Sequence, residues 1–367
     1  MNAERLHAIV GEINREIDKK GTVGMLQELV NSLQKVVSQP HPTHQQNLSQ
    51  SLKAMAAATA DSPSDRFSPT WNQIALEIGG KNILGASLRA KIDEIFARNS
   101  ITPAVALEEL QKLLSELQTF KNALVQGAAA FKQFGIGDEK LGPGDCEIGI
   151  LIPRAEVENN LLEFAEELKD IGQILNIFSE VATGKPDELS IKTISSSDLL
   201  VHLKAAAPYA ACLAVCIERV VALYKQLLEI RKLSGEIKKQ GVPEEKTTGI
   251  EEYANNLMEE GISKISVDIV NEYHKKDDKG RKNELTTAVK ISLNKIANRI
   301  DHGFNIEVRV EAPRPEDEAS GDGKESAELK KAIETIQAAM PRMQFINLEG
   351  RPILHLPETI KKQKNAD

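Results

Sequence analysis

Residues 147–153 read EIGILIP, a nearly continuous apolar run that a proline closes. A run of this length without polar alternation is typical of a strand that is buried on both faces. Two further segments have the composition of strands, LSIKTI at Leu189–Ile194 and NIEVRVE at Asn305–Glu311. The latter alternates apolar and polar residues, so we expect one of its faces to meet solvent. Because isolated strands of this length are unstable, we expect them to share one sheet.

The segment between the first two strands carries apolar residues at helical spacing, from Leu161 to Leu175. A strand, a helix and a strand in succession are typical of a βαβ unit, whose strands run parallel and are joined by a right-handed crossover. Near the C-terminus, Gln344–Leu348 and Pro352–Leu356 are interpreted as a hairpin that turns at Glu349–Gly350. The sequence therefore predicts a small mixed β-sheet with a βαβ start and a C-terminal β-hairpin.

Most of the remaining sequence is predicted to be helical, which makes the chain mainly α and α+β overall. Residues 1–134 carry short helical patterns joined by short loops, as an all-α helical bundle does. The glycine-rich stretch 135–145 (GIGDEKLGPGD) is interpreted as a linker. The remainder is predicted to comprise an α+β domain at 146–357, a long helical arm within it at 205–302 that covers the sheet, a disordered loop near 312–326 and a polar tail at 358–367.

The composition narrows the class of protein. Hydrophobic residues make up 41% of the chain, enough for a core, whereas aromatic residues make up only 4% and offer few anchors for bases or sugars. The net charge of −8 disfavours general binding to nucleic acid or to anionic membrane. Three cysteines fit a reducing compartment better than a disulfide framework. With neither a signal-peptide pattern nor an apolar stretch of membrane-spanning length, we expect a cytoplasmic location.

Most candidate site residues have a simpler structural interpretation. The linker glycines precede a strand and lack the Gly-Lys-Ser/Thr of a phosphate-binding loop. Cys212 and Cys216 share a helix face with alanine, leucine and valine, so we interpret them as core residues and not as metal ligands. Cys146 has no basic neighbour that would activate its thiol. We therefore predict no catalytic, cofactor-binding or metal-binding residue and no cofactor.

Two polar sites support an alternative hypothesis. His302 follows Asp301 at a predicted helix end, and Ser196 lies in the run SSSD at 195–198. We interpret both as helix caps. A hydrolase or a nucleotide-binding enzyme with its site near His302 and Ser196 is the alternative that they leave open. The basic run at Lys275–Lys282 contains two aspartates and is interpreted as a solvated turn, so we expect no nucleic-acid partner.

The segment AAAPYAACLAVCIERVVALYKQLLEI at Ala205–Ile230 is the most apolar in the chain. Three-four spacing of its large apolar residues is similar to that of a coiled coil. We therefore predict an interaction surface made by Leu213, Ile217, Val220, Tyr224 and Leu227. A second alternative is a membrane-acting effector that inserts this apolar helix, residues 205–228.

Abundant helical surface and the lack of a polar catalytic cluster favour a protein without enzymatic activity. We hypothesise a cytosolic scaffold or adaptor that acts in protein–protein interaction and assembly. Its expected partner is another protein or a further copy of the chain, so that it self-associates as an oligomer. A bacterial regulatory or defence system is the setting that we hypothesise for it.

Overall fold

The computed structural model describes residues 3–139, 141–142, 144–195, 199–240, 248–275, 278–311, 323–346 and 348–359. The chain forms two compact units, Met1–Lys140 and Leu141–Asp367, here called unit 1 and unit 2. The boundary between them lies inside the glycine-rich stretch 135–145. Each unit has its own hydrophobic core, and neither core contains a buried residue of the other unit.

The described part of unit 1 is helical. Its helices are α1 (Ala3–Lys20), α2 (Thr22–Ser38), α3 (Pro42–Thr59), α4 (Pro69–Glu77), α5 (Gly85–Arg98) and α6 (Pro103–Gln133). The long helix α6 packs against α1, α2 and α5, which gathers their leucine and isoleucine side chains into one core. The sequence PHPTH both ends α2 and begins α3, because Pro42 is at the first turn and the His41 side chain accepts a hydrogen bond from the Thr43 amide at 3.2 Å.

Unit 2 is built on a four-stranded antiparallel sheet with the strand order β2-β3-β1-β4. The strands are β1 (Cys146–Ile152), β2 (Ile191–Ser195), β3 (Leu199–Ala205) and β4 (Asn305–Val310). Ile148 of the central strand β1 lies opposite Leu203 of β3 and Val308 of β4, and all three are buried. These side chains face the helices that cover one side of the sheet.

The prediction of a mixed sheet is wrong, because each pair of neighbouring strands is antiparallel. The two strands of the predicted βαβ start, β1 and β2, do run in the same direction, but they are not paired with each other. Strand β3, which the sequence analysis did not identify, lies between β1 and β2, so the first two predicted strands are not neighbours. The short connection from β2 to β3 favours an antiparallel pair, and β3 in turn pairs antiparallel with β1. Of the run interpreted as a helix cap, 195–198, Ser195 is the last residue of β2, and residues 196–198 are outside the described part of the chain.

The prediction of a solvent-facing side for the third strand is also wrong. Glu307 and Arg309 of β4 are buried. On the same face, the Glu147 carboxylate lies 3.2 Å from Lys192 Nζ, 3.2 Å from His202 Nδ1 and 3.4 Å from Arg309 Nη2. The polar residues of the alternating pattern therefore form a buried network of charges rather than a wet surface.

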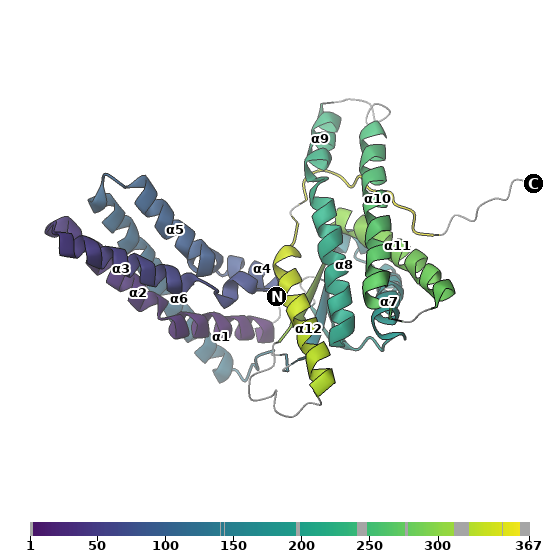
Figure 1. The fold of residues 1–367 in the computed structure, drawn as a ribbon, viewed down its shortest axis with the longest axis horizontal. Helices are drawn as coiled ribbons and strands as arrows, with labels where there is room; N and C mark the ends of the chain where they lie inside the picture. Colours follow the sequence, from purple (N-terminus) through teal and green to yellow (C-terminus); the bar gives the residue numbers. More distant parts are fainter. Residues whose placement is uncertain are drawn as a thin grey trace, which may run out of the picture. The chain divides into compact units, whose positions relative to one another are not determined.

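The helices of unit 2 are α7 (Leu161–Thr183), α8 (Ala207–Lys225), α9 (Leu228–Lys239), α10 (Thr248–Tyr273), α11 (Lys279–Asp301) and α12 (Gly323–Ala339). Helix α8 contacts β1, β4, α7, α10, α11 and α12, and it is the centre of the core (Figure 1). Its alanines allow this close packing on several sides. Of the loop predicted near 312–326, residues 312–322 are outside the described part, and 323–326 belong to α12.

The predicted C-terminal hairpin is not formed. Among the described residues between Gln344 and Leu356, none is in a strand. The chain instead runs along the helices of unit 2 as an extended segment, drawn as a yellow trace in Figure 1. We call residues 348–359 the docked segment. Of the predicted tail at 358–367, residues 360–367 are outside the described part.

Candidate functional site

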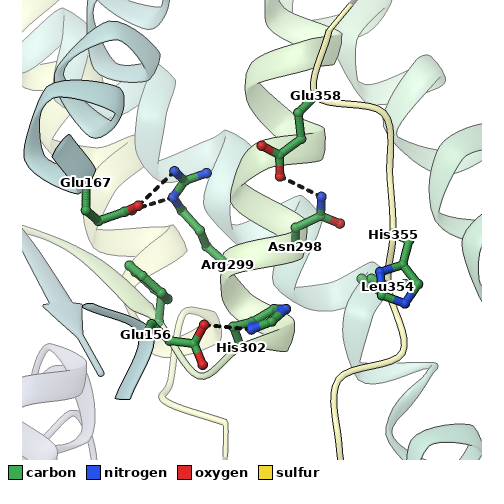
Figure 2. A pocket seen from close by; sticks show the side chains of 9 residues that line it. Glu156, Glu167, Asn298, Arg299, His302, Leu354, His355 and Glu358 are labelled. Atoms are coloured by element: carbon green, nitrogen blue, oxygen red, sulfur yellow. Dashed lines mark hydrogen bonds and ion pairs between the residues drawn. The ribbon is translucent and has the colours of Figure 1, made fainter. Parts of the chain in front are cut away.

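A cleft of about 280 Å³ opens beside the C-terminal end of α11 (Figure 2). Helix α11 contributes the side chains of its last turn, α7 contributes one glutamate, and the docked segment forms the opposite wall. The lining residues are Glu156, Glu167, Asn298, Arg299, His302, Phe304, Leu354, His355 and Glu358. Every lining residue belongs to unit 2.

One wall of the cleft is an ion-pair network between α7 and α11. Arg299 donates from Nε to Glu167 Oε1 at 2.6 Å and from Nη2 to Glu167 Oε2 at 3.1 Å, and it also pairs with Asp170. Lys295 pairs with the same Asp170. Burial raises the pKa of Asp170, but its bonds to Lys295 and Arg299 outweigh this and leave the pKa below its usual value. The charge of Arg299 is thus largely balanced by the carboxylates of Glu167 and Asp170.

His302 and Glu156 form a second pair at the mouth of the cleft. The His302 Nδ1 atom lies 2.8 Å from Glu156 Oε2, and the two side chains are 37% and 32% exposed. His302 occupies the C-cap position of α11, and Glu156 lies in the short helical turn Arg154–Val157 that follows β1. A carboxylate on Nδ1 orients the imidazole and leaves Nε2 to exchange a proton with another group.

The charges of the cleft select between ligand classes. Its lining contains three carboxylates, Glu156, Glu167 and Glu358, and one guanidinium, Arg299. No serine, threonine or cysteine is among the lining residues. An excess of carboxylate repels a phosphate or a nucleotide, and a hydroxyl or thiol nucleophile is missing among these residues. The lining favours a basic or neutral polar ligand.

The docked segment is held by side chains that bind its backbone. Asn298 donates from Nδ2 to the Leu356 carbonyl at 3.1 Å, and its Oδ1 accepts from the Leu356 amide at 3.0 Å. Asn255 of α10 donates to the Ile353 carbonyl at 3.1 Å and accepts from the His355 amide at 2.6 Å. An amide side chain offers both a donor and an acceptor, so it satisfies an extended backbone as a neighbouring strand does.

Further polar groups continue this arrangement at both ends of the segment. Asn294 donates to the Pro357 carbonyl at 2.8 Å. Arg231 of α9 donates from Nε to the Glu349 carbonyl at 3.0 Å and from Nη2 to the Gly350 carbonyl at 2.9 Å. Gly350 has a φ of 83° and approaches α9 closely, a conformation and a contact that favour glycine.

Asp301 is the central group of the arrangement. The residue is fully buried, and its Oδ2 accepts from the Ile353 amide at 2.6 Å and from the Leu354 amide at 2.7 Å. Its Oδ1 accepts from the Tyr224 hydroxyl and from Arg231 Nη1, each at 2.5 Å. Burial and then the Asp301 carboxylate raise the pKa of Tyr224, which keeps the hydroxyl as a donor.

Aliphatic side chains of the docked segment complete its attachment. Ile353, Leu354 and Leu356 are all buried and belong to the core of unit 2. His355, Glu358 and Thr359 are exposed. The segment therefore combines backbone hydrogen bonds along its length with three apolar anchors, and the groove that holds it is made by α9, α10 and α11. We call this the peptide groove.

The predicted interaction residues are not on the surface. Their side chains belong to the core of unit 2, namely Leu213, Ile217, Val220, Tyr224 and Leu227. Among them, the Tyr224 hydroxyl touches the site through Asp301. In this fold they present no surface to a partner.

Helix α8 is also the described helix whose length and composition would let it cross a membrane, but 72% of its apolar window is buried. Core helices pass the same test, and insertion of 205–228 into a lipid surface would require α8 to leave the core.

The other candidates fall outside the cleft. Cys212 and Cys216 are buried, and burial followed by the neighbouring Cys212 raises the pKa of Cys216. Burial raises the pKa of Cys146 to about 12. In the basic run, Lys275 pairs with Glu328 at 3.1 Å. Of the two residues of the alternative enzymatic site, His302 lines the cleft, and Ser196 is outside the described residues.

The residues that hold the docked segment were missed by the sequence analysis. Asn294, Asn298 and Asp301 are spaced by four and three residues, which places them on one face of α11. Asn294 and Asp301 are buried. A stripe of short polar side chains beside the leucines and isoleucines of a helix was the available signal.

Comparison with known proteins adds no further constraint. A scan against protein-family models and searches of curated proteins and of solved structures each found no match to the chain.

Proposed function

We propose that the chain is a non-enzymatic interaction module that assembles with a protein partner or with further copies of itself, and that unit 2 does so by binding an extended peptide. One observation carries the proposal. The docked segment is held as a peptide ligand is held, through its backbone by Asn255, Asn298 and Asp301 and through apolar anchors. A groove of this design exists already in the fold, with the chain's own segment as its occupant.

The chemistry of the groove suits recognition of an extended peptide. Contacts to backbone amides and carbonyls give affinity with little dependence on sequence, whereas side-chain pockets give selectivity. In the peptide groove, Asn255, Asn298 and Asp301 make the backbone contacts that give affinity. The buried positions of Ile353, Leu354 and Leu356 give the selectivity for side chains. We propose a cytoplasmic location and a bacterial regulatory or defence setting from the sequence alone.

Peptide binding to the full chain tests this function. The chain's own segment competes at the high effective concentration of a tethered ligand, so it must first be weakened. Leu356→Ala removes one apolar anchor and should let a fluorescent peptide with the sequence of residues 348–359, LEGRPILHLPET, enter the groove. We expect saturable binding by anisotropy that is at least about tenfold tighter for the Leu356→Ala chain than for the parent chain.

Two controls make the result specific. A peptide with the same residues in scrambled order should not bind. Adding Asn298→Ala to the Leu356→Ala chain should weaken binding, since one donor and one acceptor for the peptide backbone are lost. Light scattering at micromolar concentration separately tests self-association. If the peptide binds no better than its scrambled form and the chain remains a monomer, the proposed function is wrong.

A hydrolase that uses His302 is the second candidate, because Glu156 orients this imidazole in an open cleft. The class of substrate would be neutral or basic, since the carboxylates of the cleft disfavour phosphate esters. If this candidate is right, His302→Ala abolishes turnover of an ester or amide substrate while the chain stays folded. Unchanged turnover in His302→Ala would eliminate the role.

A further inference from the structure

The docked segment is well matched to the peptide groove except at one position. Its backbone from Ile353 to Pro357 is bonded to polar side chains, and its apolar residues are buried. Glu358, which comes next, places its carboxylate in a cleft that Glu156 and Glu167 already line (Figure 2). The Glu358 carboxylate accepts a hydrogen bond from a neutral group, the Asn298 amide, at 2.8 Å.

The charges around Glu358 are out of balance. The cleft and its wall hold four carboxylates, Glu156, Glu167, Asp170 and Glu358, and two cations, Lys295 and Arg299, besides the imidazoles of His302 and His355. Burial lowers the pKa of Arg299, but Glu167, Asp170 and Glu358 outweigh this and raise the pKa above its usual value. The Glu358 carboxylate is therefore attracted to this guanidinium. However, Arg299 already donates to both oxygens of Glu167 and to Asp170. With lysine or arginine in place of Glu358, the cleft and its wall would hold three carboxylates and three cationic side chains, instead of four carboxylates and two cationic side chains.

This inference rests on the proposed peptide-binding function and names the partner. We infer that the natural ligand of the peptide groove is an extended segment with the pattern aliphatic-aliphatic-x-aliphatic-proline followed by lysine or arginine, whose basic side chain enters the acidic cleft. The chain's own segment has this pattern, as Ile353-Leu354-His355-Leu356-Pro357, but ends it with glutamate. It is therefore a weaker occupant that keeps the groove filled until the basic partner displaces it.

Peptides that differ at one position test the inference. The full Leu356→Ala chain is titrated with LEGRPILHLPET and with the same peptide carrying Glu358→Lys or Glu358→Gln. We expect the lysine peptide to bind about three- to tenfold more tightly than the parent peptide, with the glutamine peptide between them, because the cleft is partly exposed and screening limits the gain. The advantage should shrink in high salt.

The protein side supplies a matched pair of variants. Glu156→Gln removes a carboxylate from the cleft and should reduce the preference for lysine. Glu163→Gln removes an exposed carboxylate from the first turn of α7, outside the cleft, and should leave the preference unchanged. If both variants reduce the preference for lysine equally, the preference comes from the net charge of the chain and not from the cleft. That result would overturn the inference.

A second measurement does not depend on the Leu356→Ala chain. In the otherwise unchanged full chain, Glu358→Lys should slow hydrogen exchange of the Ile353, Leu354 and Leu356 amides by a similar factor. Equal affinity of the lysine and glutamate peptides, or exchange that is not slowed, overturns the inference and leaves the peptide groove in place. If no peptide binds at all, peptide recognition by the groove and this inference fall together, and light scattering then decides whether self-association remains.

Discussion

At Asp301 a single carboxylate serves groups from three parts of unit 2. It accepts from the Tyr224 hydroxyl, from Arg231 and from the amides of Ile353 and Leu354. A neutral amide at this place keeps one acceptor but turns an NH₂ group toward these donors. We therefore expect Asp301→Asn to lower the free energy of unfolding of unit 2 by about 3–5 kcal/mol.

Urea unfolding measures this loss, with Asp268→Asn on α10 as the matched control. Asp268 is exposed, and its replacement should change the free energy by less than about 0.5 kcal/mol. Equal effects of the two variants would mean that the Asp301 carboxylate does not hold the docked segment.

Gly149 provides a second test at the residue scale. A Cβ at this position of β1 would lie 2.8 Å from Glu307 Cγ and 3.0 Å from His202 Cε1. Although alanine is ordinarily better than glycine in a strand, Gly149→Ala should cost about 1–3 kcal/mol of stability, because these buried side chains must move. Gly172→Ala on α7 is the opposite case, since its Cβ would make an ordinary contact of 3.9 Å with Leu189, and it should stabilise by about 0.5–1 kcal/mol.

Thermal and urea unfolding of the two glycine variants shows whether each substitution raises or lowers the stability of the chain. If Gly149→Ala is neutral or stabilising, Glu307 and His202 are not packed across β1 as described.

Among the elements, the network between α7 and α11 sets a pH dependence. The pKa of Asp170 is lowered through Lys295 and Arg299. A carboxyl with a lowered pKa contributes stability above its ordinary pKa of 3.8, and the contribution is lost as the pH falls through the lower pKa of the folded state. We expect Asp170→Asn to cost about 1 kcal/mol at pH 7, since the pair is partly exposed, and progressively less below pH 3.8.

Unfolding free energies of Asp170→Asn and the parent chain from pH 7 downward check this dependence. A difference that stays constant over the whole range would show that the loss comes from packing and not from the charge.

Elements differed in how far the sequence could predict them. The apolar run of β1 and the alternation of β4 are local properties, and both strands were identified. Strand β3 was missed because the serines and aspartate before Leu199 have the composition of a helix N-cap. The hairpin prediction failed because an extended segment needs partners for its backbone, and a sequence does not show whether these come from a strand or from asparagines on helices.

The cleft was reached from the sequence only through His302. Its partner Glu156 is far away in the chain, and Glu167 on α7 resembles any exposed helical glutamate. Polar residues on a helix ordinarily face solvent, so the role of Asn294 and Asn298 depends on where the C-terminal segment runs. That path follows from the packing of the complete unit and not from any local pattern.

At the scale of the whole molecule, the two separate cores have a consequence for unfolding. Trp71 is the chain's one tryptophan and packs against the core of unit 1. All three cysteines are buried in unit 2, and burial raises the pKa of Cys146 to about 12, so the native thiols should react slowly near pH 8. Tryptophan fluorescence and thiol modification therefore report on different units. We expect their urea transitions to have different midpoints, since each core forms from residues of its own unit.

A substitution in the peptide groove tests this expectation directly, because it should change the urea midpoint of unit 2 and not that of unit 1. Asp301→Asn should shift the midpoint that thiol modification reports and leave the tryptophan midpoint where it is. The control in the other direction is Leu110→Ala, in the core of unit 1, which should lower the tryptophan midpoint by removing a fully buried side chain worth about 2–5 kcal/mol. If either variant moves both midpoints equally, the two units unfold as one cooperative body, and the separate cores do not confer separate stability.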